Sequence, residues 1–176
     1  DLDAAIIFSD ILMTPYSLGQ DVKFVKNKGP ILSDFSINTF LSNNKENFIK
    51  KLNPVYQAIR KTRAKLDKKK SLISFIGAPW TLAVYMLGLK KDKNELDIDK
   101  LRANKMEIKV VIDKLNEYLC VHIANQINAG ADIVQIFDSW AGLIPNHNLR
   151  DYCYNPNKKI VEFCRKNQIP VICFPR

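Results

Sequence analysis

The chain has 176 residues, 47% of them hydrophobic, and a formal net charge of +9. This composition predicts one globular unit with a real core, and no apolar stretch approaches the ~20 residues that span a bilayer. With no visible signal peptide, we expect a cytoplasmic protein with no membrane partner. Because apolar runs lie almost at Asp1 and at Arg176, we expect an internal piece of a longer domain, truncated at both ends.

Short apolar runs alternate with helical patterns along the chain. The runs predict strands over residues 4–8, 71–76, 133–137 and 171–174. Helices are predicted over residues 42–52, 53–69, 81–87 and 100–127 and from Asn155, where Pro54 and Pro156 each follow an Asn cap. Residues 21–35 suggest a small hairpin, and the charged, poorly patterned residues 89–99 suggest a mobile segment.

Strands separated by helices make a series of βαβ units, which predicts a parallel sheet with right-handed crossovers. A doubly wound sheet and a (β/α)8 TIM barrel both begin this way. No glycine-rich nucleotide motif follows any strand, and polar residues follow several strands, so the barrel is favoured. A barrel needs ~250 residues, so residues 1–176 would be its first half to two thirds.

Polar residues follow two of the predicted strands directly. Ser9 and Asp10 come after the first run, and Asp138 and Ser139 after the third. The carboxyl ends of parallel strands are where ligand-binding and catalytic groups collect. The alternative is that such residues only cap the next turn.

A basic segment at residues 60–70 contains seven Lys and Arg residues and a single acid, Asp67. Such a run can mark a nucleic-acid surface. Val55, Ile59 and Leu66 hold helical spacing through it, so the solvated face of an amphipathic helix is favoured, with no nucleic-acid partner.

The cysteines and histidines match no metal signature. Cys120, Cys153, Cys164 and Cys173 fit neither a C-x-x-C pair nor zinc spacing, so we expect buried thiols in a reducing compartment. His122 lies beside the apolar stripe of the longest helix and is interpreted as a packed residue rather than a ligand.

Three motifs occur together in one order: LDAAIIFSDIL at residues 2–12, IGAPWTLAVYM at 76–86 and AGADIVQIFDSWAG at 129–142. Together with Gly29-Pro-Ile31, they closely resemble the uroporphyrinogen decarboxylase family over essentially the whole chain. The resemblance implies a single-domain (β/α)8 carboxy-lyase, homodimeric when full length. It would remove carboxyl groups from the four acetate side chains of uroporphyrinogen, a small-molecule tetrapyrrole, to give coproporphyrinogen without metal or organic cofactor.

The same resemblance implies the site residues. Asp10 corresponds to the family's central aspartate, which faces the pyrrole N–H groups and serves both catalysis and substrate binding. Tyr85 and Ser139 correspond to the tyrosine and serine that hydrogen-bond the substrate. Asp138 is interpreted as structural.

The chain departs from the family pattern in two ways. The arginine-rich segment of the family would precede Asp1 and its histidine would follow Arg176, so we expect residues 1–176 alone to be inactive. The family's glycine-rich stretch after the tyrosine motif is replaced here by residues 88–92, GLKKD.

Two other functions stay open. Corrinoid-dependent methyltransferases share the fold and bind zinc through a His-x-Cys pair and a distal Cys, whereas the nearest sequence here, Cys120-Val-His122, lies inside a predicted helix. A basic nucleic-acid-binding module is the alternative that is not an enzyme.

Overall fold

The computed structural model describes residues 2–26, 29–92 and 95–176. The main sheet contains β1 (Ala4–Ile6), β4 (Ser71–Gly77), β7 (Ile133–Asp138) and β8 (Val171–Pro175). The helices are α1 (Met13–Ser17), α2 (Ile37–Ser42), α3 (Lys45–Lys65), α4 (Pro79–Met86), α5 (Ile98–Ala103), α6 (Lys105–Asn128) and α7 (Asn155–Lys166). Two antiparallel hairpins join β2 (Val22–Val25) to β3 (Gly29–Leu32) and β5 (Lys90–Asp92) to β6 (Glu95–Leu96).

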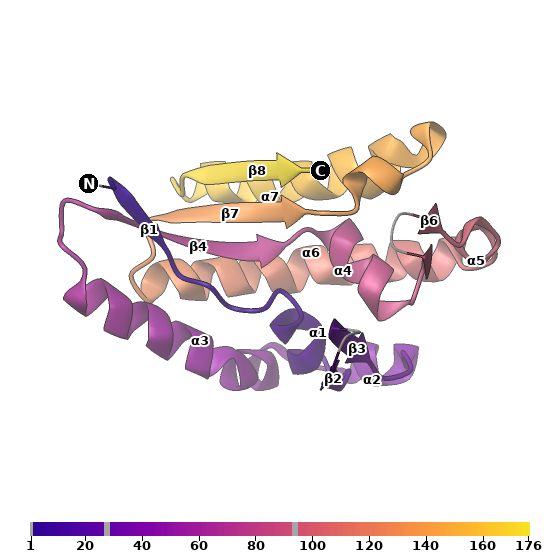
Figure 1. The fold of residues 1–176 in the computed structure, drawn as a ribbon, viewed down its shortest axis with the longest axis horizontal. Coiled ribbons are helices and arrows are strands. Elements are labelled where there is room, and N and C mark those ends of the chain that lie inside the picture. The colour runs from indigo at the N-terminus through magenta and orange to yellow at the C-terminus, as the bar shows by residue number, and fades with distance from the viewer. Residues whose placement is uncertain (1, 27–28, 93–94) are drawn as a thin grey trace.

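The four main strands are parallel, and their order across the sheet, β1-β4-β7-β8, follows the chain without reversal (Figure 1). A doubly wound sheet reverses its strand order at a switch point, whereas consecutive units of a (β/α)8 barrel do not. The predicted α/β class is confirmed, and the arrangement is that of part of a barrel.

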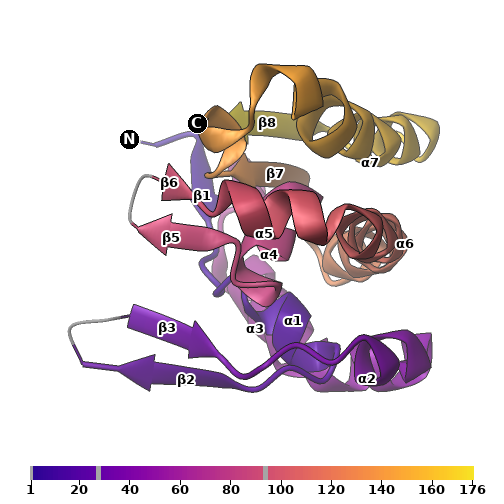
Figure 2. The same ribbon diagram turned by 90° about the vertical axis from the view of Figure 1, so that its right-hand side faces the viewer.

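Helices cover one face of the sheet. In Figure 2, α6 and α7 lie on one side of the strands, and both hairpins extend on the other. Val134 and Ile136 of β7 and Leu72 and Ile76 of β4 are buried, as is the predicted apolar stripe of α6. None of the helices in the described ranges is long and apolar enough to cross a membrane.

The opposite face carries a row of aromatic side chains, one from each main strand or its end. Adjacent ring centroids lie 5.5 Å apart from Phe8 to Phe75, 5.2 Å from Phe75 to Phe137, and 5.8 Å from Phe137 to Phe174. Phe8 is 83% exposed and Phe174 is 49% exposed. In a closed barrel this face would be the interior, where side chains fill the space.

Residues 1–176 expressed alone should therefore associate or unfold without a sharp transition. Parallel strands are normally covered on both faces, and an unclosed sheet also leaves unpaired backbone at β1 and β8. Sedimentation together with a thermal melt tests this. A monomer that melts in one sharp transition would contradict it.

The predicted pair of helices over residues 42–52 and 53–69 is wrong: α3 is one helix with Pro54 inside it. Proline has no N–H and therefore removes a hydrogen bond from a helix interior. A boundary between two helices was expected at Pro54 for this reason. Phe48, Leu52, Tyr56 and Ile59 on both sides of Pro54 are all buried. We attribute the continuity of the helix to this shared apolar face.

Residues 89–99, expected to be a mobile segment, contain regular structure in their described part that the sequence pattern did not indicate. The segment contains the β5–β6 hairpin and the start of α5, with residues 93–94 outside the described ranges. Leu89 and Leu96 are buried in the core, and Asp97 N donates to Leu89 O at 2.8 Å. The six residues between Leu89 and Leu96 are all polar, so no apolar periodicity indicated a buried hairpin.

Arg63, within the basic segment, is a structural residue. Its guanidinium donates to the backbone carbonyls of Leu66, Asp67 and Lys70 and pairs with the Asp132 carboxylate at 2.9 Å. The same carboxylate accepts a hydrogen bond from the backbone N–H of Leu72 at 2.7 Å, and Leu72 lies in β4 where this strand pairs with β1. Arg63 therefore joins the end of α3 to the starts of β4 and β7. The other cations at positions 60, 61, 65, 68 and 69 are exposed, as expected for a solvated face.

A buried polar chain connects α3, α6 and β4. His122 Nδ1 lies 3.0 Å from the Tyr56 hydroxyl and His122 Nε2 lies 3.1 Å from Gln126 Nε2. Gln126 also donates to Phe75 O and accepts from the Ser74 hydroxyl. The Gln126 amide is a donor to the ring, so Nε2 accepts and Nδ1 carries the hydrogen, a tautomer inferred from the network. His122 is a packed residue, as predicted.

Stability should fall on acidification because of His122. Burial lowers the pKa of His122 from 6.5 to about 3, so the folded protein holds it neutral. The unfolded chain binds a proton below pH 6.5, and stability is lost as the pH falls from 6.5 towards 3 at up to ~1.4 kcal/mol per pH unit. We expect about 2 kcal/mol of the loss between pH 7 and 5 in the intact protein to come from His122.

Urea unfolding at the two pH values measures this loss, with His122→Gln as the matched variant because an amide keeps both a donor and an acceptor. The variant should be less sensitive to pH than the unchanged protein. Equal pH dependence of the two proteins would show that His122 does not carry the effect.

Candidate functional site

The three predicted site residues all lie beyond the C-terminal ends of parallel strands. Asp10 follows β1, Tyr85 lies on α4 after β4, and Ser139 directly follows β7. Asp10 and Tyr85 are half-buried and Ser139 is exposed. The fold therefore places all three at one edge of the sheet, although 75 residues separate Asp10 from Tyr85 and 54 separate Tyr85 from Ser139.

The Asp10 carboxylate is oriented by the chain that follows it. Asp10 Oδ1 accepts from Leu12 N at 2.8 Å, and Asp10 O accepts from Met13 N at 3.0 Å as α1 begins. A carboxylate has two acceptor oxygens. No hydrogen bond to Asp10 Oδ2 comes from the described residues, so this oxygen is available to a ligand.

Tyr85 contacts Trp140 and lies within electrostatic range of Asp10. Burial raises the pKa of Tyr85; the Trp140 side chain lowers it by a smaller amount, and the charge of Asp10 adds a still smaller rise. The phenol is therefore neutral at pH 7 and has an O–H to donate. The rings of Tyr85 and Trp140 meet edge to face, with centroids 5.9 Å apart. Trp140 Nε1 is buried, and its N–H has no acceptor of suitable geometry among the described residues.

Sequence reasoning missed two neighbours of this group, Trp140 and Lys90. Lys90 Nζ lies 3.9 Å from the centroid of the Trp140 ring. Trp140 stands directly after Ser139 in the third motif, and that adjacency was a usable signal. Lys90 had none, because it belongs to the segment whose structure was not predicted.

Asp138 is a buried structural residue, as interpreted from the sequence. It is 1% exposed, and its carboxylate accepts from the Thr81 hydroxyl at 2.8 Å and from Asn157 Nδ2 at 2.9 Å. Thr81 Oγ1 in turn accepts from Trp140 N at 3.2 Å, and Trp80 Nε1 donates to Trp140 O at 2.9 Å. These bonds hold the backbone that presents Ser139 and Trp140.

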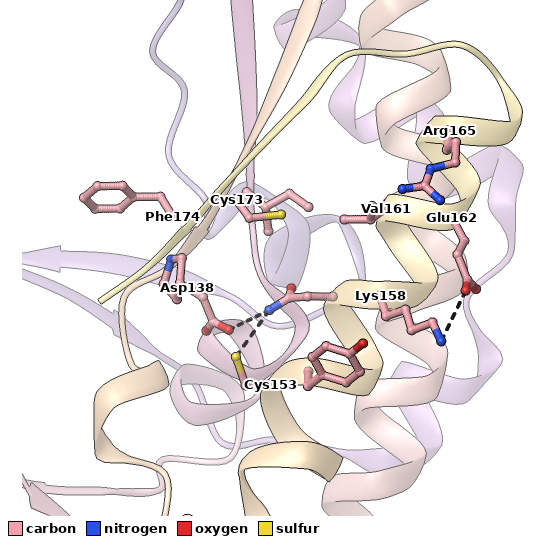
Figure 3. Close-up of a pocket in the computed structure, with 12 residues that line it drawn as sticks. Asp138, Cys153, Lys158, Val161, Glu162, Arg165, Cys173 and Phe174 are labelled. Carbon is pink, nitrogen blue, oxygen red and sulfur yellow. Dashed lines mark hydrogen bonds and ion pairs between the residues drawn. The ribbon is translucent and has the colours of Figure 1, made fainter.

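A cavity of about 480 Å³ lies between β8 and α7 (Figure 3). The Asp138 carboxylate and the Cys153 thiol both contact the Asn157 amide there. Burial raises the pKa of Cys153 to about 11, and nearby Asp138 adds to the rise, so the thiol is protonated at neutral pH. Since strand side chains alternate and Asp138 points to the helices, this cavity is not part of the Asp10–Tyr85 group.

A second cavity, of about 360 Å³, is lined by Tyr85 together with Ser33, Asp34, Lys100 and Glu107, among others. Its polar side chains come from the segment after β3 and from α5 and α6. Tyr85 therefore stands between this cavity and Trp140.

No three His, Cys, Asp or Glu side chains gather as metal ligands within the described part of the chain. Both ring nitrogens of His122 already have partners, and Cys120 lies half-buried on the same helix. The four cysteines are free thiols, but only Cys164 is buried, and Cys173 is exposed. The expectation of uniformly buried thiols is wrong because β8 has no neighbour on its outer edge in the described sheet.

Comparison with known proteins relates the whole chain to one family. Residues 1–176 match the family described as "Uroporphyrinogen decarboxylase (URO-D)". Proteins named uroporphyrinogen decarboxylase are similar: that of Rickettsia bellii is 40% identical over 99% of this chain and 52% of its own length. The protein of Orientia tsutsugamushi is 41% identical over 100% of this chain and 52% of its own length. That of Campylobacter jejuni is 40% identical over 100% of this chain and 53% of its own length. The chain thus spans about half the length of these relatives.

A solved structure gives the same fold. A methyltransferase from Methanosarcina mazei superposes with a TM-score of 0.73, covering 98% of this chain and 51% of that chain, at 15% identity. At this identity the likeness concerns the fold alone.

Proposed function

The chain belongs to the uroporphyrinogen decarboxylase family, and from this premise we propose that the intact protein decarboxylates the acetate side chains of uroporphyrinogen to give coproporphyrinogen. The observation that carries the proposal is the position of Asp10. The family match covers all 176 residues, and Asp10 stands at the C-terminal edge of the sheet, within electrostatic range of Tyr85.

Asp10 is proposed as the residue that binds the pyrrole N–H groups and stabilises positive charge. Direct loss of CO2 from a pyrrole acetate leaves a carbanion, so the pyrrole is first protonated at carbon. The C–C bond to the carboxylate then breaks, CO2 leaves, and the electron pair moves into the cationic ring to give an exocyclic methylene. Protonation of this methylene and loss of the extra proton from the ring carbon give the methyl group and restore the pyrrole. A fixed carboxylate that accepts pyrrole N–H bonds positions the ring and stabilises the cation as it forms. The Leu12 N–H bond at 2.8 Å supports such fixed orientation.

Tyr85 and Ser139 are proposed as substrate-binding residues. The neutral Tyr85 phenol has a donor for a carboxylate, and the exposed Ser139 hydroxyl follows β7 on the same edge. No step in this proposal uses a metal or an organic cofactor. The chain spans about half the length of its relatives, so we propose that residues 1–176 form part of a larger barrel and are inactive alone.

The same family membership supports a homodimer, and the four free thiols support a reducing compartment such as the cytoplasm. Sedimentation of the intact protein tests the first, and localisation of a tagged intact protein tests the second.

The deciding experiment supplies uroporphyrinogen to the intact protein under reducing, anaerobic conditions, with and without a chelator. Chromatography of the oxidised products should show stepwise loss of carboxyl groups down to coproporphyrinogen, unaffected by the chelator. Absence of any decarboxylated product would refute the proposal, and activity that the chelator abolishes would refute its cofactor-independent form.

A further inference from the structure

Lys90 is held at a defined position beside the site. It is the first residue of β5 and follows Leu89, which is fully buried. Leu89 N donates to Val84 O at 3.0 Å, and Leu89 O accepts from Asp97 N at 2.8 Å. Gly88, with φ of +56°, makes the turn between α4 and this anchored residue. The backbone at Lys90 is therefore fixed to the core on its N-terminal side.

The ring under Lys90 is equally fixed. The Trp140 backbone is bonded at both its N–H and its carbonyl, to Thr81 and Trp80. A lysine ammonium 3.9 Å from an indole centroid is well inside the ~6 Å range of cation–π attraction, and Trp is the strongest partner for it. The attraction holds the positive charge over Trp140, next to Ser139 in the chain.

Tyr85 and Lys90 both contact Trp140, and Ser139 precedes Trp140 in the chain; we call these four residues the rim cluster. The Tyr85 ring contacts Trp140 at 5.9 Å, and Lys90 contacts the same ring. Figure 2 shows the β5–β6 hairpin extending on the side of the sheet away from α6 and α7, the side that carries the phenylalanine row. The rim cluster places one positive charge beside neutral hydroxyl groups, at the same edge as the Asp10 carboxylate.

An ammonium over an aromatic ring can bind an anion at the same time. An ammonium has three N–H donors, so contacts with a ring or with another group of the protein do not prevent it from also binding an anion. Because the stack already restrains the long side chain, less conformational freedom is lost when a carboxylate binds. A lysine in this setting suits a carboxylate of a large ligand whose ring system lies over Asp10.

We propose that Lys90 is a substrate-binding residue that holds a peripheral carboxylate of the tetrapyrrole at the rim cluster, with Trp140 as its platform. The proposal rests on the proposed function for the identity of the ligand. It adds a cation within residues 1–176 to a site that otherwise shows an acid and hydroxyl groups. It also gives a role to the GLKKD segment that replaces the family's glycine-rich stretch.

The test uses the intact protein and three variants: Lys90→Gln, Lys90→Arg and Lys91→Gln. Lys91 is the matched control, because it is the neighbouring lysine on the same hairpin and forms a surface pair with Glu95 at 3.8 Å. Two quantities are measured: the Kd for uroporphyrin, a stable oxidised form with the same side chains, by equilibrium dialysis, and KM and kcat with uroporphyrinogen. Thermal melts establish that each variant is folded.

Lys90→Gln should raise Kd and KM about tenfold, the loss expected for one charge-assisted hydrogen bond, and leave kcat within about twofold. Lys90→Arg should keep most of the affinity and Lys91→Gln should keep all of it. If Lys90→Gln binds uroporphyrin as tightly as Lys91→Gln, the proposal is overturned, whatever the turnover. If the unchanged protein binds uroporphyrin through Lys90 but never decarboxylates uroporphyrinogen, the proposed function fails while the anion site stands.

Discussion

Asp10→Asn in the intact protein should lower kcat with uroporphyrinogen about 100-fold or more and change KM far less. The amide keeps the size of the side chain and an oxygen that accepts the Leu12 N–H bond, so the local turn is preserved. It removes the formal charge that is aimed at a developing cation, and such preorganised charges contribute on the order of 10²-fold or more in a dry site.

Steady-state kinetics of Asp10→Asn are compared with those of a control variant, Asp99→Asn. Asp99 is an exposed carboxylate in the first turn of α5, so its loss alters the net charge equally without touching the site. Asp99→Asn should retain full turnover. Normal kcat in Asp10→Asn would rule out the electrostatic role, and a large rise in KM at constant kcat would assign Asp10 to binding alone.

Arg63→Met should destabilise the intact protein by about 2–4 kcal/mol, because several hydrogen bonds from one largely buried guanidinium are lost together. Methionine keeps part of the aliphatic stem that packs near Gly130, where an added Cβ would lie 2.9 Å from Arg63 Cγ. Three backbone carbonyls and the Asp132 carboxylate lose their donor. The Arg63 side chain is 21% exposed, so water replaces these bonds only in part.

Urea unfolding measures the loss, with Arg60→Met as the control. Arg60 lies one turn earlier on α3, is exposed and makes a single bond to Asn53 at 3.3 Å. Its replacement should cost less than about 0.5 kcal/mol, as for most surface substitutions. Similar losses for the two variants would show that Arg63 is only part of a solvated face.

Much of the fold could be predicted from local patterns. The four strands, the stripe of α6 and Pro156 in the first turn of α7 are each visible within a window of a few turns. The predicted cap at Asn155 is wrong, because Asn155 is already the first residue of α7 and Tyr154 occupies the cap position. Apolar periodicity reports burial on one side of an element, and that information is local. The order of strands without a nucleotide motif favoured the barrel, and polar residues after β1 and β7 indicated the edge on which Asp10 and Ser139 lie.

What failed were inferences about segments whose local signals conflict with their packing. Pro54 lowers local helix propensity, yet α3 continues past it because the side chains on both sides of Pro54 are buried on one face of the helix. Residues 89–99 show no period, yet Leu89 and Leu96 are two buried anchors that are enough to fold a hairpin. In both cases tertiary burial outweighs local preference.

The sequence by itself determined the four main strands, their order and the strand ends that carry Asp10 and Ser139. Only the tertiary structure decided the partners: Arg63 with Asp132, Asp138 with Thr81, and Lys90 with Trp140 are 69, 57 and 50 residues apart. The physical reason is that charge pairing, hydrogen bonding and stacking act over a few ångströms of space. Their participants are set by how the βα units pack together, which no local pattern contains.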